Sequence, residues 1–83
     1  MKSIVREFQT EAVIFREGEI GNTAYILTEG QVEISIQQDG QKSVLAVLNP
    51  VTVFGEMALL LKDQKRTATA KAVGETKIAT THR

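Results

Sequence analysis

Residues 32–48 read VEISIQQDGQKSVLAVL and contain the clearest structural pattern in the chain. From Val32 to Ile36, apolar residues alternate with polar ones, which is the period of a half-buried β-strand. Asp39-Gly40 follows, and both residue types tolerate a positive φ, so the pair predicts a tight hairpin turn. Residues 42–48 would then form the returning strand. The sequence therefore predicts an antiparallel hairpin in the middle of the chain.

The sequence on either side of this hairpin predicts further short strands. Val, Ile and Thr are abundant and favour strands. Turn signals such as Glu29-Gly30 and Gly74-Glu75 recur about every 8–12 residues, the spacing of a sandwich or barrel. The expected strands are 13–15, 24–28, 67–73 and 76–80, with Ala68, Ala70 and Ala72 on one face of the third. Residues 1–7 fit either an edge strand or a fraying helix.

One segment departs from the extended pattern. Residues 56–61 (EMALLL) contain strong helix formers and no β-branched residue. They lie between Gly55 and the polar segment 62–65. This composition predicts a helix of one or two turns.

Length and composition limit the classes of protein to consider. The 83 residues suffice for one domain, and a domain this small buries a modest share of its surface. There is no cysteine, which excludes disulfides and thiolate metal sites. The 10 basic and 10 acidic residues are scattered, so the chain lacks the basic footprint of a nucleic-acid-binding domain. Apolar runs are far too short to span a bilayer, and no secretory signal is visible, so we expect no membrane contact and a cytoplasmic location.

The residues with the most informative chemistry lie in 54–70, FGEMALLLKDQKRTATA. A helix that begins after Gly55 would present free N–H groups and a positive dipole end, which suit a phosphate. Arg66 lies ten residues after Glu56, and its planar fork can donate two parallel hydrogen bonds to a phosphate. An ionised Glu56 only accepts hydrogen bonds, so a sugar hydroxyl suits it. Together these groups indicate a nucleotide site, although a surface ion pair between Glu56 and Arg66 is the simpler alternative.

Two segments of this region carry a family resemblance. Residues 54–60 (FGEMALL) and 66–72 (RTATAKA) closely resemble the phosphate-binding cassette of cyclic-nucleotide-binding domains. Such domains occur in catabolite-activator-type transcription factors, cyclic-nucleotide-dependent kinases and cyclic-nucleotide-gated channels. Residues 14–27 (IFREGEIGNTAYIL) and 29–34 (EGQVEI) also look like this family. The resemblance covers residues 8–80 and implies a mainly β fold, an eight-stranded jelly-roll β-roll with one short helix in the cassette.

The resemblance also implies a role for each matching residue. Glu56 would accept a hydrogen bond from the ribose 2′-hydroxyl, and Arg66 would bind the cyclic phosphate. Backbone groups of Gly55, Met57 and Ala58 would line the phosphate, and Thr67 and Ala68 would close its other side. Gly18, Gly21 and Gly30 match the turn glycines of the family.

The chain departs from the family pattern in two places. Val51-Thr52 stands where many members carry Gly-Asp, which alters a turn and leaves the ligand contacts intact. Members also continue into a C-terminal helix that covers the base and often forms the dimer. We therefore expect residues 1–83 to be a single cyclic-nucleotide-binding domain without this lid helix.

The resulting functional prediction is a regulatory sensor module of a larger signalling or transcription-regulating protein, not an enzyme. It would bind cAMP first, and cGMP as well, and pass the signal to an attached effector domain or a second copy of the chain. No further cofactor, no metal and no nucleic-acid contact by this chain are expected. One alternative is a degenerate β-roll that packs or dimerises without nucleotide. A cupin-type enzyme on a similar jelly roll is a weaker one, because His82 is the only histidine and metal-dependent chemistry needs several.

Overall fold

The computed structural model describes residues 2–56 and 62–82, and this part of the chain consists of strands and loops. The strands are β1 (Lys2–Phe8), β2 (Val13–Phe15), β3 (Ala24–Gln38), β4 (Gln41–Leu48), β5 (Thr52–Phe54) and β6 (Thr69–His82). Every pairing among them is antiparallel, and together they form one sheet. The predicted mainly β fold is confirmed. Among the described residues, no helix is long and apolar enough to cross a membrane.

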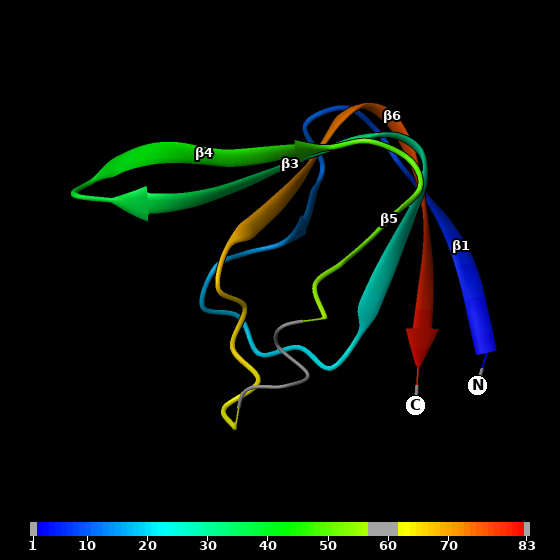
Figure 1. Ribbon diagram of the computed structural model, residues 1–83, viewed down its shortest axis with the longest axis horizontal. Coiled ribbons are helices and arrows are strands. Elements are labelled where there is room, and N and C mark those ends of the chain that lie inside the picture. Colours follow the sequence, from blue (N-terminus) through cyan, green and yellow to red (C-terminus); the bar gives the residue numbers. More distant parts are fainter. Residues whose placement is uncertain (1, 57–61, 83) are drawn as a thin grey trace.

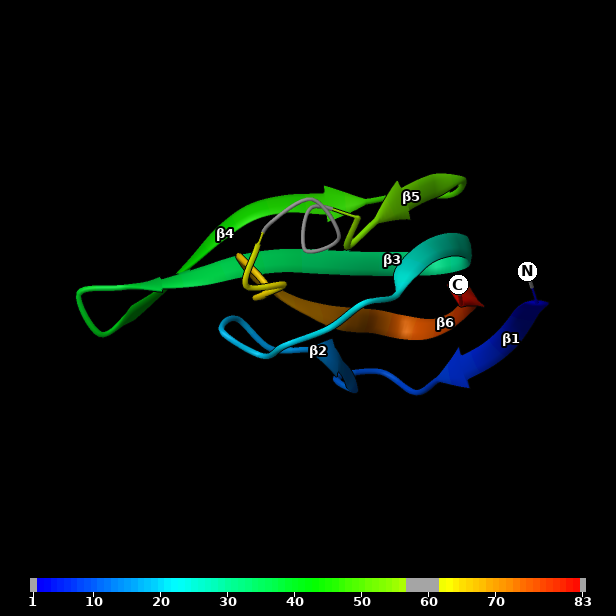
Figure 2. The same cartoon turned by 90° about the horizontal axis from the view of Figure 1, so that it is seen from below.

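The two longest strands, β3 and β6, lie next to each other in the middle of a rolled sheet. Its order is β1-β6-β3-β4, with β2 paired to β6 and β5 paired to β3 (Figure 2). β3 bends at Gly30 (φ +89°), where its register with β6 shifts, and β6 contains Gly74 (φ +74°) nearby. These bends let the first half of each long strand lie at an angle to its second half (Figure 1). The result is the expected jelly-roll architecture.

The central hairpin is confirmed in detail. Asp39 and Gly40 have φ angles of +53° and +77°, and Gln38 pairs with Gln41 across the two-residue turn. Both positive angles are what a hairpin turn of this kind needs to match the twist of its strands. The tip of this hairpin lies at the opposite end of the molecule from the two termini (Figure 1).

Some strand boundaries differ from the sequence prediction. The expected turns at Glu29-Gly30 and Gly74-Glu75 are bends within continuous strands. The described part of the chain therefore contains six strands where eight were expected. Of residues 1–7, residues 2–7 form a strand, because β1 pairs with β6 from Lys2↔His82 to Phe8↔Thr76, and Met1 lies outside the described part. β5 was not predicted. In the expected helix 56–61, Glu56 lies in a turn, and the remaining residues lie outside the described part.

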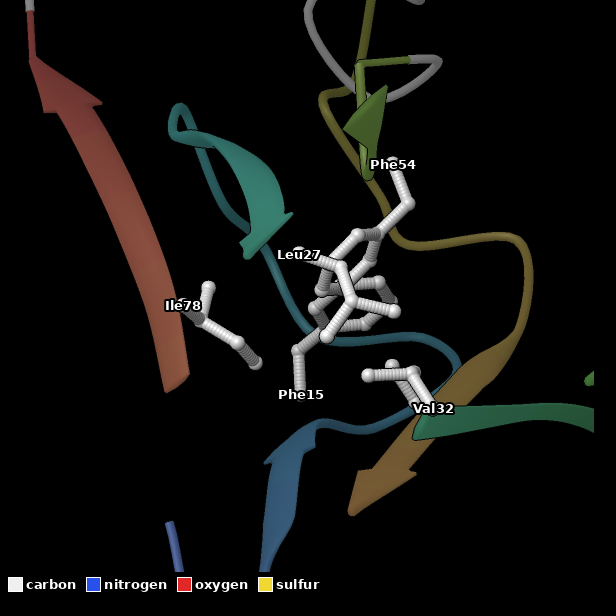
Figure 3. Packing of buried hydrophobic residues seen from close by; sticks show 6 residues of the cluster. Phe15, Leu27, Val32, Phe54 and Ile78 are labelled. Carbon is white, nitrogen blue, oxygen red and sulfur yellow. The ribbon is translucent and has the colours of Figure 1, made fainter. Parts of the chain in front are cut away.

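The core lies inside the roll. The buried cluster contains Phe15, Leu27, Val32, Phe54, Ala70 and Ile78, one or two from each of the strands β2, β3, β5 and β6. Figure 3 shows the larger of these side chains converging from different strands. Full burial of a Leu, Val or Ile side chain contributes about 1.5–3 kcal/mol. The predicted alanine face is also confirmed, since Ala68, Ala70 and Ala72 are all buried.

Ion pairs on the outside add little to this core. Lys71 of β6 contacts Glu11 at 2.8 Å, and Lys77 contacts Glu29 at 3.1 Å. The hydrogen bond from Lys71, with its positive charge, holds the pKa of Glu11 below its ordinary value. Glu11 is exposed, so solvent and salt weaken such a pair. The stability of the fold therefore rests mainly on the apolar cluster.

Candidate functional site

The backbone of Arg66 is fixed by the loop that joins β2 to β3. The Arg66 N–H donates to the Glu19 carbonyl at 2.7 Å, and the Gly18 N–H donates to the Arg66 carbonyl at 2.8 Å. The Gly21 N–H donates to the Gln64 carbonyl at 3.0 Å. These three bonds anchor the segment just before β6 and set where the Arg66 side chain begins.

The Arg66 side chain is buried, with only 4% of its surface exposed. Its Nη1 donates to the Gly55 carbonyl at 2.7 Å, and its Nη2 donates to the Thr23 carbonyl at 3.0 Å. None of the ion pairs among the described residues includes Arg66. The guanidinium is thus held by neutral carbonyl groups and keeps its full positive charge inside the protein.

Aromatic rings lie against the same guanidinium. The Cζ atom of Arg66 is 4.4 Å from the ring centroid of Phe15 and 5.4 Å from that of Tyr25. Both rings stack with Phe54, at centroid separations of 6.1 Å and 5.4 Å. Cations are attracted to aromatic faces at such distances, because the ring quadrupole is negative there.

Close packing around the guanidinium leaves little space for a side chain at two glycine positions. A Cβ atom on Gly21 would lie 2.5 Å from Nη2 of Arg66, and a Cβ on Gly55 would lie 3.0 Å from Nη1. Gly55 also has a φ of +79°, which side-chain-bearing residues rarely adopt. The backbone therefore approaches the guanidinium from two sides.

A cavity of about 280 Å³ opens beside this arginine. Its apolar wall is formed mainly by β3, β4 and β5, through side chains such as Ile34, Leu48 and Val53. Its polar side includes Glu56, Arg66 and Thr67. Among the described residues, the lining consists of Phe15, Ile34, Ala46, Leu48, Val53, Phe54, Gly55, Glu56, Arg66, Thr67 and Ala68.

The structure gathers five of the seven predicted site residues at this cavity: Gly55, Glu56, Arg66, Thr67 and Ala68. Glu56 and Thr67 are exposed at its rim, while Ala68 is buried. Glu56 and Arg66 are not joined by an ion pair, so the alternative of a simple surface pair does not hold. Met57 and Ala58 lie outside the described residues.

Two larger hollows lie elsewhere on the described surface. One, of about 580 Å³, lies beside Glu29, Glu75 and Lys77, and another, of about 680 Å³, beside Arg16, Glu17 and Gln37. Both are lined largely by exposed polar side chains, without a buried cation. Within residues 2–56 and 62–82, no three acidic, histidine or cysteine side chains form a group that could hold a metal ion.

Sequence reasoning missed several residues of the site. No role in the site was predicted for Phe15, Tyr25, Phe54 or Thr23. One signal could have singled out the rings: the chain has only three Phe and one Tyr. Three of these four residues stack beside Arg66. Thr23 contributes a backbone carbonyl, for which its side chain gives no signal.

Comparisons with known proteins agree with this geometry. The family model for the cyclic nucleotide-binding domain matches residues 5–83. The cAMP-dependent protein kinase regulatory subunit of Dictyostelium discoideum is 40% identical over 74 residues, covering 84% of this chain. The chain spans only 22% of that relative's length.

Solved structures agree as well. The catabolite activator protein of Thermus thermophilus superposes with a TM-score of 0.89 at 33% identity, over 98% of this chain and 38% of its own. An EAL enzyme gives TM-scores of 0.86 in its cAMP-bound form and 0.87 in its cGMP-bound form. Both forms are 32% identical over 94% of this chain and 21% of the enzyme. From the family match, the shared fold and the matching cassette, we conclude that this chain belongs to the cyclic nucleotide-binding domain family.

Proposed function

We propose that this chain binds cAMP, and cGMP as well, in the 280 Å³ cavity beside Arg66. The cyclic phosphate lies at Arg66 and at the backbone of Gly55, Met57 and Ala58. Thr67 and Ala68 close the other side of the phosphate. The cavity is close to the lower size limit of small-ligand pockets, about 300 Å³. Residues 1–83 act as one binding domain.

The buried charge of Arg66 is the observation that carries this proposal. A guanidinium has five N–H donors. Among the described residues, two of them donate to the carbonyls of Gly55 and Thr23, and the other three have no described partner. No carboxylate of the described residues pairs with this cation. A buried charge without a counter-ion favours an anion in the adjoining cavity, and phosphate matches its planar fork.

The remaining lining fits the sugar and the base. Glu56 at the rim can accept a hydrogen bond from the ribose 2′-hydroxyl, which a carboxylate binds well. The apolar wall around Ile34, Leu48 and Val53 can cover part of a purine. The cAMP-bound and cGMP-bound forms of the similar EAL enzyme support both nucleotides as ligands.

Calorimetric titration with cAMP and 2′-deoxy-cAMP tests the position of the ribose. For cAMP, Glu56→Gln should lower the affinity by about tenfold, because hydrogen bonds to charged groups contribute about 1.5–3 kcal/mol. For 2′-deoxy-cAMP, the wild-type chain and Glu56→Gln should bind equally, since the ligand lacks the hydroxyl. Equal losses for both nucleotides would show that Glu56 does not contact the 2′-hydroxyl.

The proposed biological role depends on binding of the nucleotide and not on a catalysed reaction. We propose a regulatory module in the cytoplasm that passes the nucleotide signal to an attached effector domain or to a second copy. The ligand would shift an equilibrium between two arrangements of the attached parts. The similar kinase regulatory subunit supports this role, whereas the similar EAL enzyme shows that such a domain also occurs in an enzyme.

A packing module that binds no nucleotide is the second candidate function. It is favoured by one observation, that Arg66 bridges the Thr23 and Gly55 carbonyls and so joins two segments of the fold. In that case Arg66 would contribute to stability alone. The absence of any heat of binding with cAMP or cGMP, in a folded wild-type chain, would decide for this candidate.

A further inference from the structure

We propose that Phe15 and Tyr25 are positioning residues that orient the Arg66 guanidinium toward the phosphate. The proposal rests on the nucleotide-binding function given above and names the groups that prepare its main cation. In this proposal, the aromatic rings of Phe15 and Tyr25 interact electrostatically with the guanidinium in addition to packing in the core.

The Arg66 guanidinium lies close to two aromatic rings. The Arg66 Cζ lies 4.4 Å from the Phe15 centroid and 5.4 Å from the Tyr25 centroid, within the range of cation–π attraction. A long arginine side chain has many rotamers, so a fixed guanidinium needs several contacts to hold it. The two rings supply contacts to its face, while the carbonyls of Thr23 and Gly55 bind its edge.

The aromatic rings beside Arg66 form a stack that holds them in place. Phe15 and Tyr25 stack on each other at 5.6 Å, and Phe54 stacks on both. Figure 3 shows the rings of Phe15 and Phe54 side by side inside the roll. Tyr25 is two residues from Thr23, and Phe54 directly precedes Gly55. The rings therefore fix the same backbone segments whose carbonyls accept the two hydrogen bonds from Arg66.

The groups that hold the Arg66 guanidinium carry no negative charge. A carboxylate could also hold the guanidinium, but it would neutralise the cation and compete with a phosphate. Aromatic faces and carbonyl dipoles stabilise a cation and leave its net charge unchanged. This arrangement keeps Arg66 preorganised and still attractive to an anion, which lowers the cost of ordering it on binding.

The test is a double-mutant cycle measured as cAMP affinity. Phe15→Leu removes the ring and keeps apolar bulk, and Arg66→Gln removes the charge and keeps most of the length. Loss of a cation–π contact of about 1 kcal/mol corresponds to about a fivefold weaker affinity. Phe15→Leu should therefore weaken binding about fivefold in the wild-type background and leave it unchanged in the Arg66→Gln background. An equal loss in both backgrounds would overturn the proposal, because Phe15 would then be only a wall of the cavity.

Phe54→Leu is the matched control for this cycle. Phe54 belongs to the same stack and the same cavity but has no cation–π contact with Arg66 among those found in the described residues. Its loss of affinity should depend less on the Arg66 background than that of Phe15→Leu, because Phe54 acts on Arg66 only through the Gly55 backbone. If Phe54→Leu couples to Arg66 as strongly as Phe15→Leu does, general packing explains the coupling and the proposal fails.

Two further measurements keep the test decisive. Tyr25→Phe retains the ring and should keep the wild-type affinity, whereas Tyr25→Leu should weaken binding; this pair serves if Phe15→Leu does not fold. The NMR signal of the Arg66 Nε–H in the nucleotide-free chain should carry a ring-current shift that Phe15→Leu removes. A wild-type signal without that shift overturns the proposal, while a shifted signal in a chain that binds no cyclic nucleotide overturns the proposed function instead.

Discussion

Arg66 combines two properties that are seldom found together in one residue. It is almost fully buried, and it is held by two carbonyls and two rings instead of a carboxylate. Burial of an unpaired charge is costly, so these contacts must offset the loss of water. Its positive charge faces a cavity of about 280 Å³. The chemistry of the proposed site is therefore concentrated in a single side chain.

Thr67, the next residue, offers a test of nucleotide selectivity. Its exposed side chain lies at the cavity rim, where a hydroxyl can accept a hydrogen bond from the 2-amino group of guanine. Adenine has no such group. Thr67→Ala should therefore lower the affinity for cGMP by about fivefold, the equivalent of one hydrogen bond, and change that for cAMP less. Competition binding with both nucleotides measures this, and equal losses would show that Thr67 contacts only the phosphate.

Among the elements, the bends in β3 and β6 shape the site. Gly30 and Gly74 both have positive φ angles, but their surroundings differ. A Cβ on Gly30 would lie 2.4 Å from the Glu75 carbonyl oxygen, whereas a Cβ on Gly74 meets no atom within 4 Å. The close approach at Gly30 brings the two bends together and turns the sheet back over its core.

This difference predicts unequal effects of two matched substitutions. Gly74→Ala meets only the strain of a positive φ, about 1–3 kcal/mol. Gly30→Ala meets the same strain and a collision with backbone, so it should cost at least about 2 kcal/mol more and lower Tm by about 8–16 °C relative to Gly74→Ala. Thermal unfolding followed by circular dichroism compares them. Equal Tm values would mean that the strands can separate at Gly30 without cost.

Some elements of the fold could be predicted from the sequence and others could not. The hairpin at Asp39-Gly40 and the strand Val13–Phe15 could be predicted because local residues determine them. The bends at Gly30 and Gly74 resembled turns, since a glycine with positive φ serves either purpose and only the pairing of β3 with β6 decides. The three residues of β5 are too few to show a period.

The residues of the candidate site likewise fall into a group that the sequence identifies and a group that it does not. Gly55, Glu56, Arg66, Thr67 and Ala68 belong to one contiguous motif, and the sequence could identify them. Phe15, Tyr25 and Thr23 reach Arg66 only through the rolling of the sheet, which no local pattern encodes.

At the scale of the whole molecule, the roll assembles the site from distant parts of the sequence. β2, the start of β3, the end of β5 and the segment before β6 all contribute to the surroundings of Arg66. The two ends of the described chain lie side by side, since β1 and β6 pair from Lys2↔His82 onward (Figure 1). Binding at a site built from so many segments should stabilise the whole fold, because the ligand binds only the folded chain.

The most direct test of the account is the cAMP affinity of Arg66→Ala, measured by calorimetry beside the wild-type chain and Arg66→Lys. Charge-assisted hydrogen bonds contribute about 1.5–3 kcal/mol each, so Arg66→Ala should bind at least about tenfold more weakly. Arg66→Lys keeps the positive charge without the planar fork, so its affinity for cAMP should lie between those of the wild-type chain and Arg66→Ala. Circular dichroism confirms that each variant is folded. An Arg66→Ala chain that is folded and binds cAMP as tightly as the wild type would contradict the account.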